Sequence, residues 1–382
     1  MGVVLGVDRF LSEGLYRRFT DKKLAVLCNQ SAVTSHLTYS VSEFKSRGLD
    51  IRYVLAPEHG FWGLGGPGEQ IADTYDWVLE TPIKSIYTRE EGFNVLEDVD
   101  VVLVDIQDLG VRFYTYVTAV LQTLEQASYR GVSEVVILDR PNPLGGSIFE
   151  GPVLRKEFKS YVGYLEMPLR YGLTLGELSL YYNMEKSLGL DIYVIYMLNY
   201  SRSLDIVDLG IQWIPPSPAI PDRETVFTYP SLALLEGTNV SEGRGTYTPF
   251  KVLGAPFINS RKLCDKLNSL KIPGVFFRPT YFKPMFSKHS NSVCGGVFAH
   301  VAKRKDVEVT ALGVSILKTL YELYPDYIEF TEAGGRFYID LLLGVSSWRD
   351  AVFSEGLRDF ISTAREESES FRELVKPFIL YS

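Results

Sequence analysis

Short β-branched runs alternate with helix-like stretches through the first half of the chain, and this alternation constrains the fold more than any other feature. Strands that alternate with helices form a parallel sheet whose crossover helices cover its faces. Thr174, followed by Glu177 three residues later, makes a capping box for the third helix. The pattern predicts an α/β fold with a Rossmann-like, doubly wound, mostly parallel sheet over residues 1–200. The expected strands are Lys23–Cys28, Ile51–Leu55, Val99–Asp105, Ser133–Leu138 and Ile192–Tyr196, and the expected helices are Tyr39–Arg47, Phe113–Arg130 and Leu175–Leu188.

The composition changes at Trp213–Pro221, where four prolines fall within seven residues. Proline excludes a regular helix and a central strand, so an extended segment is expected to cross here between two domains. The chain beyond it mixes both kinds of element and predicts a smaller α+β domain over residues 201–382, which completes a cleft. The expected strands there are Gly274–Arg278 and Gly295–Ala302, and the expected helices are Val309–Tyr324 and Trp348–Glu367.

A net charge of -8 and a pI near 5.3 oppose nonspecific attachment to nucleic acid or to an anionic membrane. No run approaches about 20 apolar residues, so no membrane insertion is expected. The first residues carry no basic leader, which predicts a cytoplasmic protein unless a leader has been removed. Cys28, Cys264 and Cys294 fit neither a disulfide scaffold nor a zinc pattern. The protein is expected to be a monomer or a homodimer.

The segment Pro57–Gly63 places Glu58 and His59 on a loop directly behind an expected strand, where α/β folds carry their chemistry. A carboxyl group partly removed from water by Pro57, Phe61 and Trp62 is suited to donate a proton near neutrality. The alternative is a carboxylate that caps local backbone amides beside a surface histidine. The glycines from Gly63 to Gly68 lack the strand–helix context of a dinucleotide loop, so no cofactor is expected; they are expected to let the loop fold over Glu58.

Further acids end the neighbouring expected strands. Asp105 and Gln107 lie just before Arg112, and Asp139 begins a second cluster with Arg140 and Asn142. A carboxylate beside an arginine stays ionised, and one protonated plus one ionised carboxyl is what glycoside hydrolysis requires. The alternatives are a structural ion pair between Asp105 and Arg112, and a rigid proline turn after Asp139.

The segment Glu236–Thr246 packs acids, an arginine and small polar side chains around three glycines, and the segment Lys288–Gly296 is a weaker polar loop of the same kind. Glycine lets backbone amides approach a ligand closely, so the first loop is a candidate binding loop. A plain solvated hairpin loop is the alternative, because these residue types dominate turns.

Several motifs together resemble one family, the exo-acting β-N-acetylmuramidases of the NamZ type, over nearly the whole chain. The resemblance implies a metal-independent glycoside hydrolase that releases N-acetylmuramic acid from the non-reducing end of peptidoglycan fragments. It also implies a cleft between a Rossmann-like and a smaller domain, with Glu58 as the leading catalytic residue. The motifs are NQSAV from Asn29, PEHGFWG from Pro57, VDIQDLGVRFYTY from Val104, LDRPNPLGG from Leu138, EGP from Glu150, RYGLTLGEL from Arg170, PPSPAIP from Pro215, LLEGTNVSEGRGT from Leu234, GAPFI from Gly254 and KHSNSVCGGV from Lys288.

The expected catalytic residues are therefore Glu58 as proton donor, with Asp105 or Asp139 as base, nucleophile or stabiliser. An acidic protein needs a dedicated arginine for the lactyl carboxylate of N-acetylmuramic acid, and four arginines are candidates. A muropeptide-binding sensor without catalysis is the alternative function, and a nucleotide-dependent oxidoreductase is a third. The expected substrate-binding residues are Asn29, His59, Gln107, Arg112, Tyr114, Tyr116, Arg140, Asn142, Glu150, Arg170, Glu236, Asn239, Glu242, Arg244 and His289.

Overall fold

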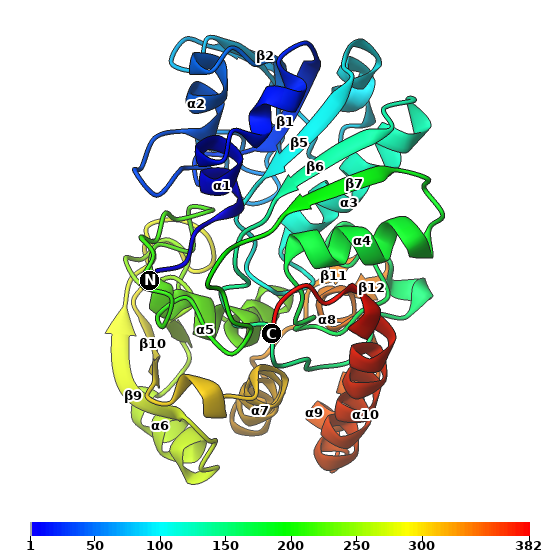
Figure 1. The fold of residues 1–382 in the computed structure, drawn as a ribbon. Helices are drawn as coiled ribbons and strands as arrows, with labels where there is room; N and C mark the ends of the chain where they lie inside the picture. Colours follow the sequence, from blue (N-terminus) through cyan, green and yellow to red (C-terminus); the bar gives the residue numbers. More distant parts are fainter. Residues whose placement is uncertain (1) are drawn as a thin grey trace.

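The predicted parallel sheet is present in the computed structural model, which describes residues 2–382. Its seven strands lie in the order β3-β4-β2-β1-β5-β6-β7, and only β3 runs antiparallel to its neighbour. The chain leaves β1 towards one edge and β5 towards the other, so the sheet is doubly wound (Figure 1). The strands are β1 (Lys23–Cys28), β2 (Asp50–Ala56), β3 (Thr74–Asp76), β4 (Thr81–Ser85), β5 (Val101–Asp105), β6 (Glu134–Leu138) and β7 (Asp191–Ile195).

Both faces of the sheet are covered, which explains why its central strands are apolar throughout. Leu24 and Val26 of β1 pack into one hydrophobic cluster, while Ala25 and Leu27 pack into another on the opposite face. The first cluster lies beneath α1 (Gly6–Ser12) and α2 (Ser40–Ser46). The second lies beneath α3 (Thr115–Tyr129) and α4 (Leu175–Glu185), and it continues into the second half of the chain. The predicted capping box of α4 is confirmed, with both Thr174 and Glu177 bonded as expected.

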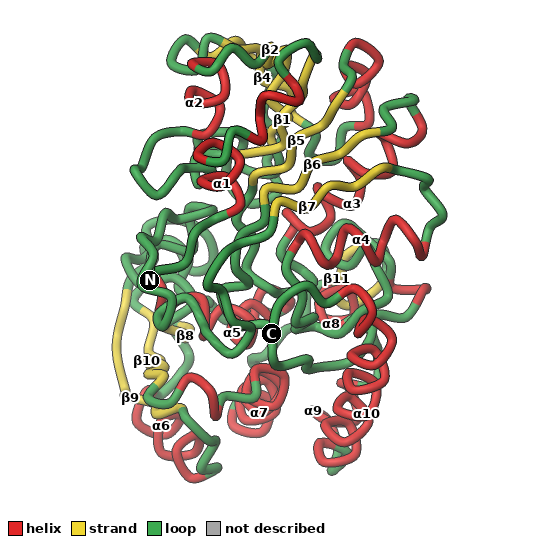
Figure 2. The backbone as a smooth tube through the Cα atoms, in the orientation of Figure 1, coloured by secondary structure: helices red, strands yellow, loops and turns green. Residues whose placement is uncertain are grey.

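The second half holds a small antiparallel sheet in the order β8-β10-β9, which lies at the edge of the molecule and packs against α5 and α6 (Figure 2). The predicted helix Trp348–Glu367 is wrong as a single element, because Ser354 takes an extended backbone conformation and separates α9 from α10. The elements are α5 (Arg223–Leu232), β8 (Val252–Ala255), α6 (Ser260–Ser269), β9 (Val275–Phe282), β10 (Cys294–Val301), α7 (Val309–Leu323), β11 (Glu332–Ala333), β12 (Arg336–Phe337), α8 (Tyr338–Leu343), α9 (Trp348–Phe353) and α10 (Leu357–Val375). Short 3-10 helices are η1 (Leu15–Phe19), η2 (Glu90–Asp98), η3 (Lys156–Phe158), η4 (Ala233–Gly237), η5 (Arg304–Asp306) and η6 (Lys376–Phe378).

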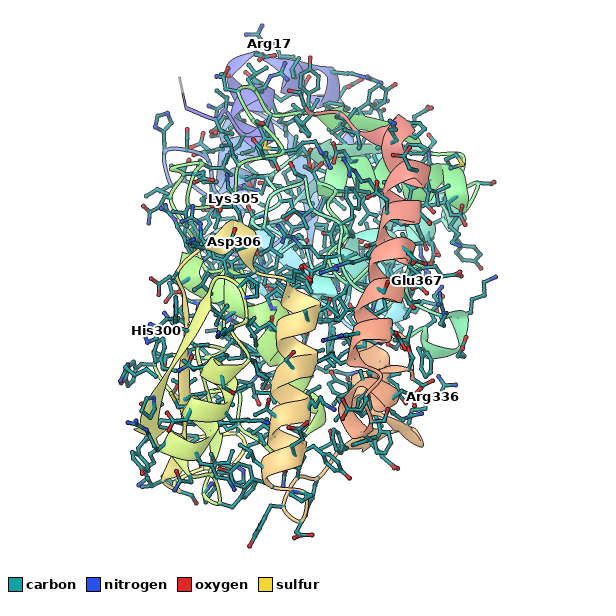
Figure 3. The ribbon with its side chains drawn as sticks, turned by 90° about the horizontal axis from the view of Figure 1, so that it is seen from below. Arg17, His300, Lys305, Asp306, Arg336 and Glu367 are labelled. Atoms are coloured by element: carbon teal, nitrogen blue, oxygen red, sulfur yellow. The ribbon has the colours of Figure 1, made fainter. Side chains whose placement is uncertain are left out.

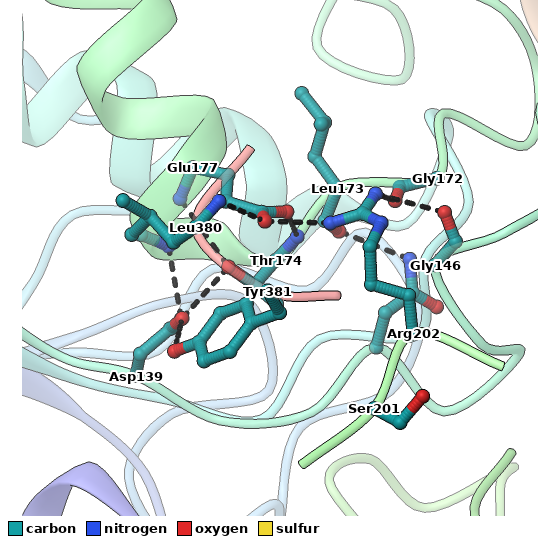
Figure 4. Close-up of polar contacts among 12 residues, drawn as sticks. Asp139, Gly146, Gly172, Leu173, Thr174, Glu177, Ser201, Arg202, Leu380 and Tyr381 are labelled. Carbon is teal, nitrogen blue, oxygen red and sulfur yellow. Dashed lines mark hydrogen bonds and ion pairs between the residues drawn. The ribbon is translucent and has the colours of Figure 1, made fainter. Parts of the chain in front are cut away.

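The long helix α10 is tied to the first half of the chain. The carboxylate of Glu367, labelled on α10 in Figure 3, accepts a hydrogen bond from the backbone N–H of Val153 at 2.9 Å and pairs with Arg155. The last residues then return to the parallel sheet (Figure 4). The hydroxyl of Tyr381 donates to Asp139 Oδ2 at 2.5 Å, and the backbone N–H of Leu380 donates to Glu177 Oε1 at 2.8 Å.

This C-terminal anchor gives a first prediction. Tyr381→Phe removes a buried hydroxyl that donates to Asp139 and accepts the backbone N–H of Met197 at 3.0 Å. The variant leaves the N–H of Met197 without its acceptor and Asp139 with one donor fewer, which is expected to lower the free energy of unfolding by about 1–3 kcal/mol. Urea unfolding of the variant and the wild type measures the difference. An unchanged midpoint would show that the tail does not stabilise the sheet.

Within residues 2–382 we find no helix long and apolar enough to cross a membrane.

Candidate active site

A cavity of about 230 Å³ lies where the two halves of the chain meet. The loops after β2 and β4 and the start of α3 form one side, and the crossing segment forms another. The remaining wall comes from α5, η4, the loop after η4, and α8. The lining residues are Glu58, His59, Pro67, Gly68, Tyr87, Phe113, Tyr114, Thr115, Val162, Ser217, Ala219, Ile220, Tyr229, Glu236, Arg244, Phe250, Tyr338 and Leu342.

Glu58 is buried at the end of β2, and donors surround its carboxyl group. The backbone N–H of Gly68 donates to Oε1 at 2.8 Å, and the hydroxyl of Thr115 donates to Oε2 at 2.6 Å. Burial, together with the nearby charge of Glu58, raises the pKa of Tyr87 to about 12, so the Tyr87 hydroxyl keeps its proton. This arrangement suits a carboxylate, because each of these neighbours offers a hydrogen to its oxygens.

The aromatic surroundings of Glu58 differ from those expected. Phe61 packs in the hydrophobic cluster beneath α1 and α2. The indole N–H of Trp62 donates to Asp76 Oδ2 at 2.5 Å. Neither ring lines the cavity. The neighbouring rings come instead from residues far away in sequence. They are Tyr87, Phe113, Tyr114, Tyr229, Phe250 and Tyr338.

The glycine-rich loop folds over Glu58 as predicted, and it also orients His59. His59 has a left-handed backbone with φ of 71°, and its Nδ1 lies 2.9 Å from the carbonyl oxygen of Gly65. Because a carbonyl oxygen only accepts, we infer that Nδ1 carries the proton. The other nitrogen, Nε2, is then left as an acceptor for a ligand in the cavity.

Glu236 is the second carboxyl group that lines the cavity, and Arg244 holds one of its oxygens. Arg244 donates to Glu236 Oε1 from Nη2 at 2.7 Å and from Nε at 3.2 Å. Burial raises the pKa of Glu236 in spite of this guanidinium. Behind the pair, Glu242 lies 3.6 Å from Arg244 and accepts a hydrogen bond from Lys288 at 2.9 Å. A proton on Glu236 therefore belongs on Oε2, since Oε1 already faces donors only.

The two acids expected to assist Glu58 lie outside this cavity. Asp105 is fully buried and pairs with Arg140 at 2.6 Å, rather than with Arg112. Asp139 accepts hydrogen bonds from Thr174, Gly176 and Tyr381, and burial raises its pKa to about 6. These contacts give both acids structural roles, so the geometry does not support their expected catalytic roles.

Several expected binding residues also have structural partners. Arg112 is completely buried and donates to the carbonyl oxygens of Pro152, Met167 and Leu342. Burial lowers its pKa to about 9. Arg170 donates to the carbonyl of Leu144, Glu150 accepts from the N–H of Thr310, and Asn142 bonds to Leu144 and Leu173. None of these side chains lines the cavity, so the geometry does not support their expected role as ligand contacts.

Of the remaining expected residues, some hold the cavity walls without lining them. Asn29 and Tyr116 both donate to the carbonyl oxygen of Pro216 in the crossing segment, at 2.8 and 2.6 Å. Asn239 donates to the carbonyl of Tyr327, and His289 contacts the carbonyl of Asn239 at 2.6 Å. Gln107 and Arg140 line a different cavity. The structure thus brings together Glu58, His59, Tyr114, Glu236 and Arg244 among the residues predicted.

Four residues that line the cavity were not predicted from the sequence: Tyr87, Thr115, Tyr229 and Tyr338. Tyr87 follows β4, a strand next to the edge of the sheet that contains Pro82 and Lys84 and therefore did not resemble a strand. Thr115 begins α3 and follows the end of β5 by ten residues. This position close to the end of a strand could have identified it as a site residue. Nothing in the local sequence marks Tyr229 or Tyr338 as site residues.

Among residues 2–382, we find no group of three or more His, Cys, Asp or Glu side chains placed to hold a metal ion.

Comparison with known proteins finds one family over both halves of the chain. The family models for the N-terminal and C-terminal parts of the exo-β-N-acetylmuramidase NamZ match residues 24–224 and 227–381. The peptidoglycan β-N-acetylmuramidase NamZ of Bacillus subtilis (strain 168) is 36% identical over 384 residues, which cover 99% of this chain and 91% of the relative.

Two crystal structures of DUF1343 family proteins from Bacteroides fragilis NCTC 9343 are also similar. One has a TM-score of 0.88 at 29% identity and the other 0.78 at 27%, and each alignment covers 100% of this chain and 99% of the other. With both family models matched in order across nearly its whole length, the chain belongs to the NamZ family of exo-β-N-acetylmuramidases.

Proposed function

We propose that this glycoside hydrolase uses the Glu58 cavity to release N-acetylmuramic acid from the non-reducing end of peptidoglycan fragments. The observation that carries the proposal is that Glu58 and Glu236, from different halves of the chain, line one cavity of about 230 Å³. Two carboxyl groups around one sugar are the usual requirement of glycoside hydrolysis. The small volume suits a single terminal sugar better than a long chain, in agreement with exo-action.

The two acids take different roles in this proposal. Glu236 is the proton donor, because burial raises its pKa and its free Oε2 can reach a leaving oxygen. Its proton passes to the glycosidic oxygen as the bond to the anomeric carbon breaks. Glu58, held by donors, acts as a carboxylate at the anomeric carbon, either directly or through water. These roles reverse the sequence-based hypothesis for Glu58.

Arg244 recognises the lactyl carboxylate that distinguishes N-acetylmuramic acid from N-acetylglucosamine. Of the four arginines considered from the sequence, it is the one that lines the Glu58 cavity. Burial lowers the pKa of Arg244, but the neighbouring acids Glu236 and Glu242 together more than offset this, so its pKa is raised and it remains a cation. A planar guanidinium can bind Glu236 with one edge and a substrate carboxylate with another.

Arg244→Lys tests this assignment. A lysine keeps the charge but loses the planar set of donors, so the preference for an aryl N-acetylmuramide over the matching N-acetylglucosaminide should fall by about 10- to 100-fold. The ratio of kcat/KM for the two glycosides measures that preference. An equal loss on both glycosides would remove Arg244 from lactyl recognition.

The raised pKa of Glu236 also fixes the sign of the pH dependence. A proton donor works while it is protonated, so kcat/KM should fall as the pH rises through the pKa of Glu236. A pH profile of kcat/KM on the disaccharide N-acetylmuramic acid–N-acetylglucosamine measures this limb. A rate that rises across the same interval would contradict the assigned role.

The function itself is tested by incubating the pure protein with that disaccharide and following the products by NMR that resolves the anomers. We expect free N-acetylmuramic acid, and its first-formed anomer distinguishes retention from inversion. Binding without any release of monosaccharide would support the non-catalytic sensor instead. The expected cytoplasmic location, the monomeric or dimeric state and the domain division at residue 200 stay predictions.

A further inference from the structure

A second cavity, of about 290 Å³, opens where the winding of the parallel sheet reverses. The chain leaves β1 and β5 in opposite directions, and open α/β sheets bind ligands at such a point, beyond the carboxyl ends of the strands. Val33 follows β1, Gln107 follows β5 and Arg140 follows β6, and all three line this cavity. None of its lining residues lines the Glu58 cavity.

Arg140 offers an unused donor in this cavity. Its side chain is 6% exposed, with Nε bonded to Asp105 at 2.6 Å and Nη2 bonded to the carbonyl oxygen of Val33 at 2.8 Å. Its Nη1 makes no hydrogen bond to any residue from 2 to 382 and is not enclosed by protein. Because Asp105 balances the charge of Arg140, this end of the cavity attracts a neutral acceptor as well as an anion.

Gln107 offers an unused acceptor. Its Nε2 donates to the carbonyl oxygens of Asp108 at 2.8 Å and Pro141 at 3.0 Å, which fixes the orientation of the amide. Its Oε1 receives no hydrogen from the described residues, and the side chain is 7% exposed. The other walls are largely apolar and include Leu5, Ile206, Leu209 and Trp213.

We propose that this cavity is a second ligand site, for a small molecule that carries a neutral amide, such as an N-acylated amino acid or a short peptide. An amide presents an acceptor and a donor together, which matches Arg140 Nη1 and Gln107 Oε1. Its apolar substituents then pack against the aliphatic and indole walls. A carboxylate would satisfy Arg140 but would repel the oxygen of Gln107.

The crossing segment couples the two cavities. Trp213 and Ile214 line the second cavity, while Ser217 and Ala219 of the same segment line the Glu58 cavity. Between them, the carbonyl oxygen of Pro216 is held by Asn29, Gln30 and Tyr116. A ligand that binds more tightly when this shared wall is in its sugar-binding arrangement stabilises that arrangement, so the site acts as an effector site that lowers KM.

Calorimetry with N-acetyl-L-alanine methylamide tests the proposal on the full chain. We expect saturable binding of one molecule per chain. An analogue in which esters replace both amides should bind at least about tenfold more weakly. The amide should also lower the KM for the disaccharide. Gln107→Leu should abolish binding, with thermal melting as the check that this variant folds. The ester comparison uses the wild type and needs no variant.

Three results would overturn the proposal: no saturable binding, equal binding of the ester, or displacement of the amide by N-acetylmuramic acid. The last would place the amide in the Glu58 cavity. An unchanged KM despite binding would remove the effector role. Disaccharide turnover without the amide depends on the Glu58 cavity alone, so failure here is distinguishable from failure of the proposed function.

Discussion

Glu58→Gln is expected to slow hydrolysis of the disaccharide by about 10³-fold, near the middle of the range for catalytic carboxyl groups. The amide can still accept the N–H of Gly68 and match the shape of glutamate, so the fold and sugar binding should persist. What is lost is the negative charge at the anomeric carbon. Steady-state kinetics with the disaccharide measures kcat, and thermal melting checks the fold.

Glu69→Gln is the matched control for this variant. Glu69 lies on the same glycine-rich loop and accepts the N–H of Gly66 at 2.7 Å, but it does not line the cavity. Its variant should keep kcat within about twofold of the wild type, because exposed loop substitutions have small effects. Equal losses in the two variants would mean that the loop, and not the Glu58 charge, limits turnover.

Glu236→Gln is expected to slow the same reaction by at least about 10²-fold, because the leaving sugar then departs without a proton. Arg244 can still donate to the amide oxygen, so its position should be kept. The alkaline limb of the pH profile should disappear together with the ionisable group. Residual activity measured from pH 5 to 9 tests both statements.

Glu224→Gln serves as the control for this second variant. Glu224 pairs with Lys251 on the exposed side of α5 and lies outside the cavity. Its variant should behave as the wild type. If Glu236→Gln kept wild-type turnover and pH profile, the second carboxyl would have to be sought elsewhere.

The sheet was predictable because its strands are short apolar runs bounded by polar loops, and five of its seven strands lie where the sequence placed them. β4 was not predicted, because it contains Pro82 and Lys84, which are untypical of a strand but are tolerated near the edge of the sheet. The break between α9 and α10 depends on the backbone conformation of Ser354, which local periodicity does not reveal.

For the site, the sequence could identify polar loops at strand ends but could not rank their acids. Asp105, Asp139 and Glu58 look alike in sequence, since each ends a strand next to polar residues. The difference lies in distant partners. The hydroxyl that binds Asp139 belongs to Tyr381, 242 residues later, whereas Glu58 meets Glu236 across a cavity formed by both halves of the chain.

In the proposed mechanism, Glu236 donates the proton and Glu58 acts at the anomeric carbon. The most direct test compares Glu236→Gln and Glu58→Gln on two substrates: the disaccharide, and a 4-nitrophenyl N-acetylmuramide whose leaving group departs without protonation. We expect Glu236→Gln to lose at least about 10²-fold more activity on the disaccharide than on the nitrophenyl glycoside, and Glu58→Gln to be impaired on both. Equal losses of Glu236→Gln on the two substrates, or the opposite pattern between the variants, would contradict it.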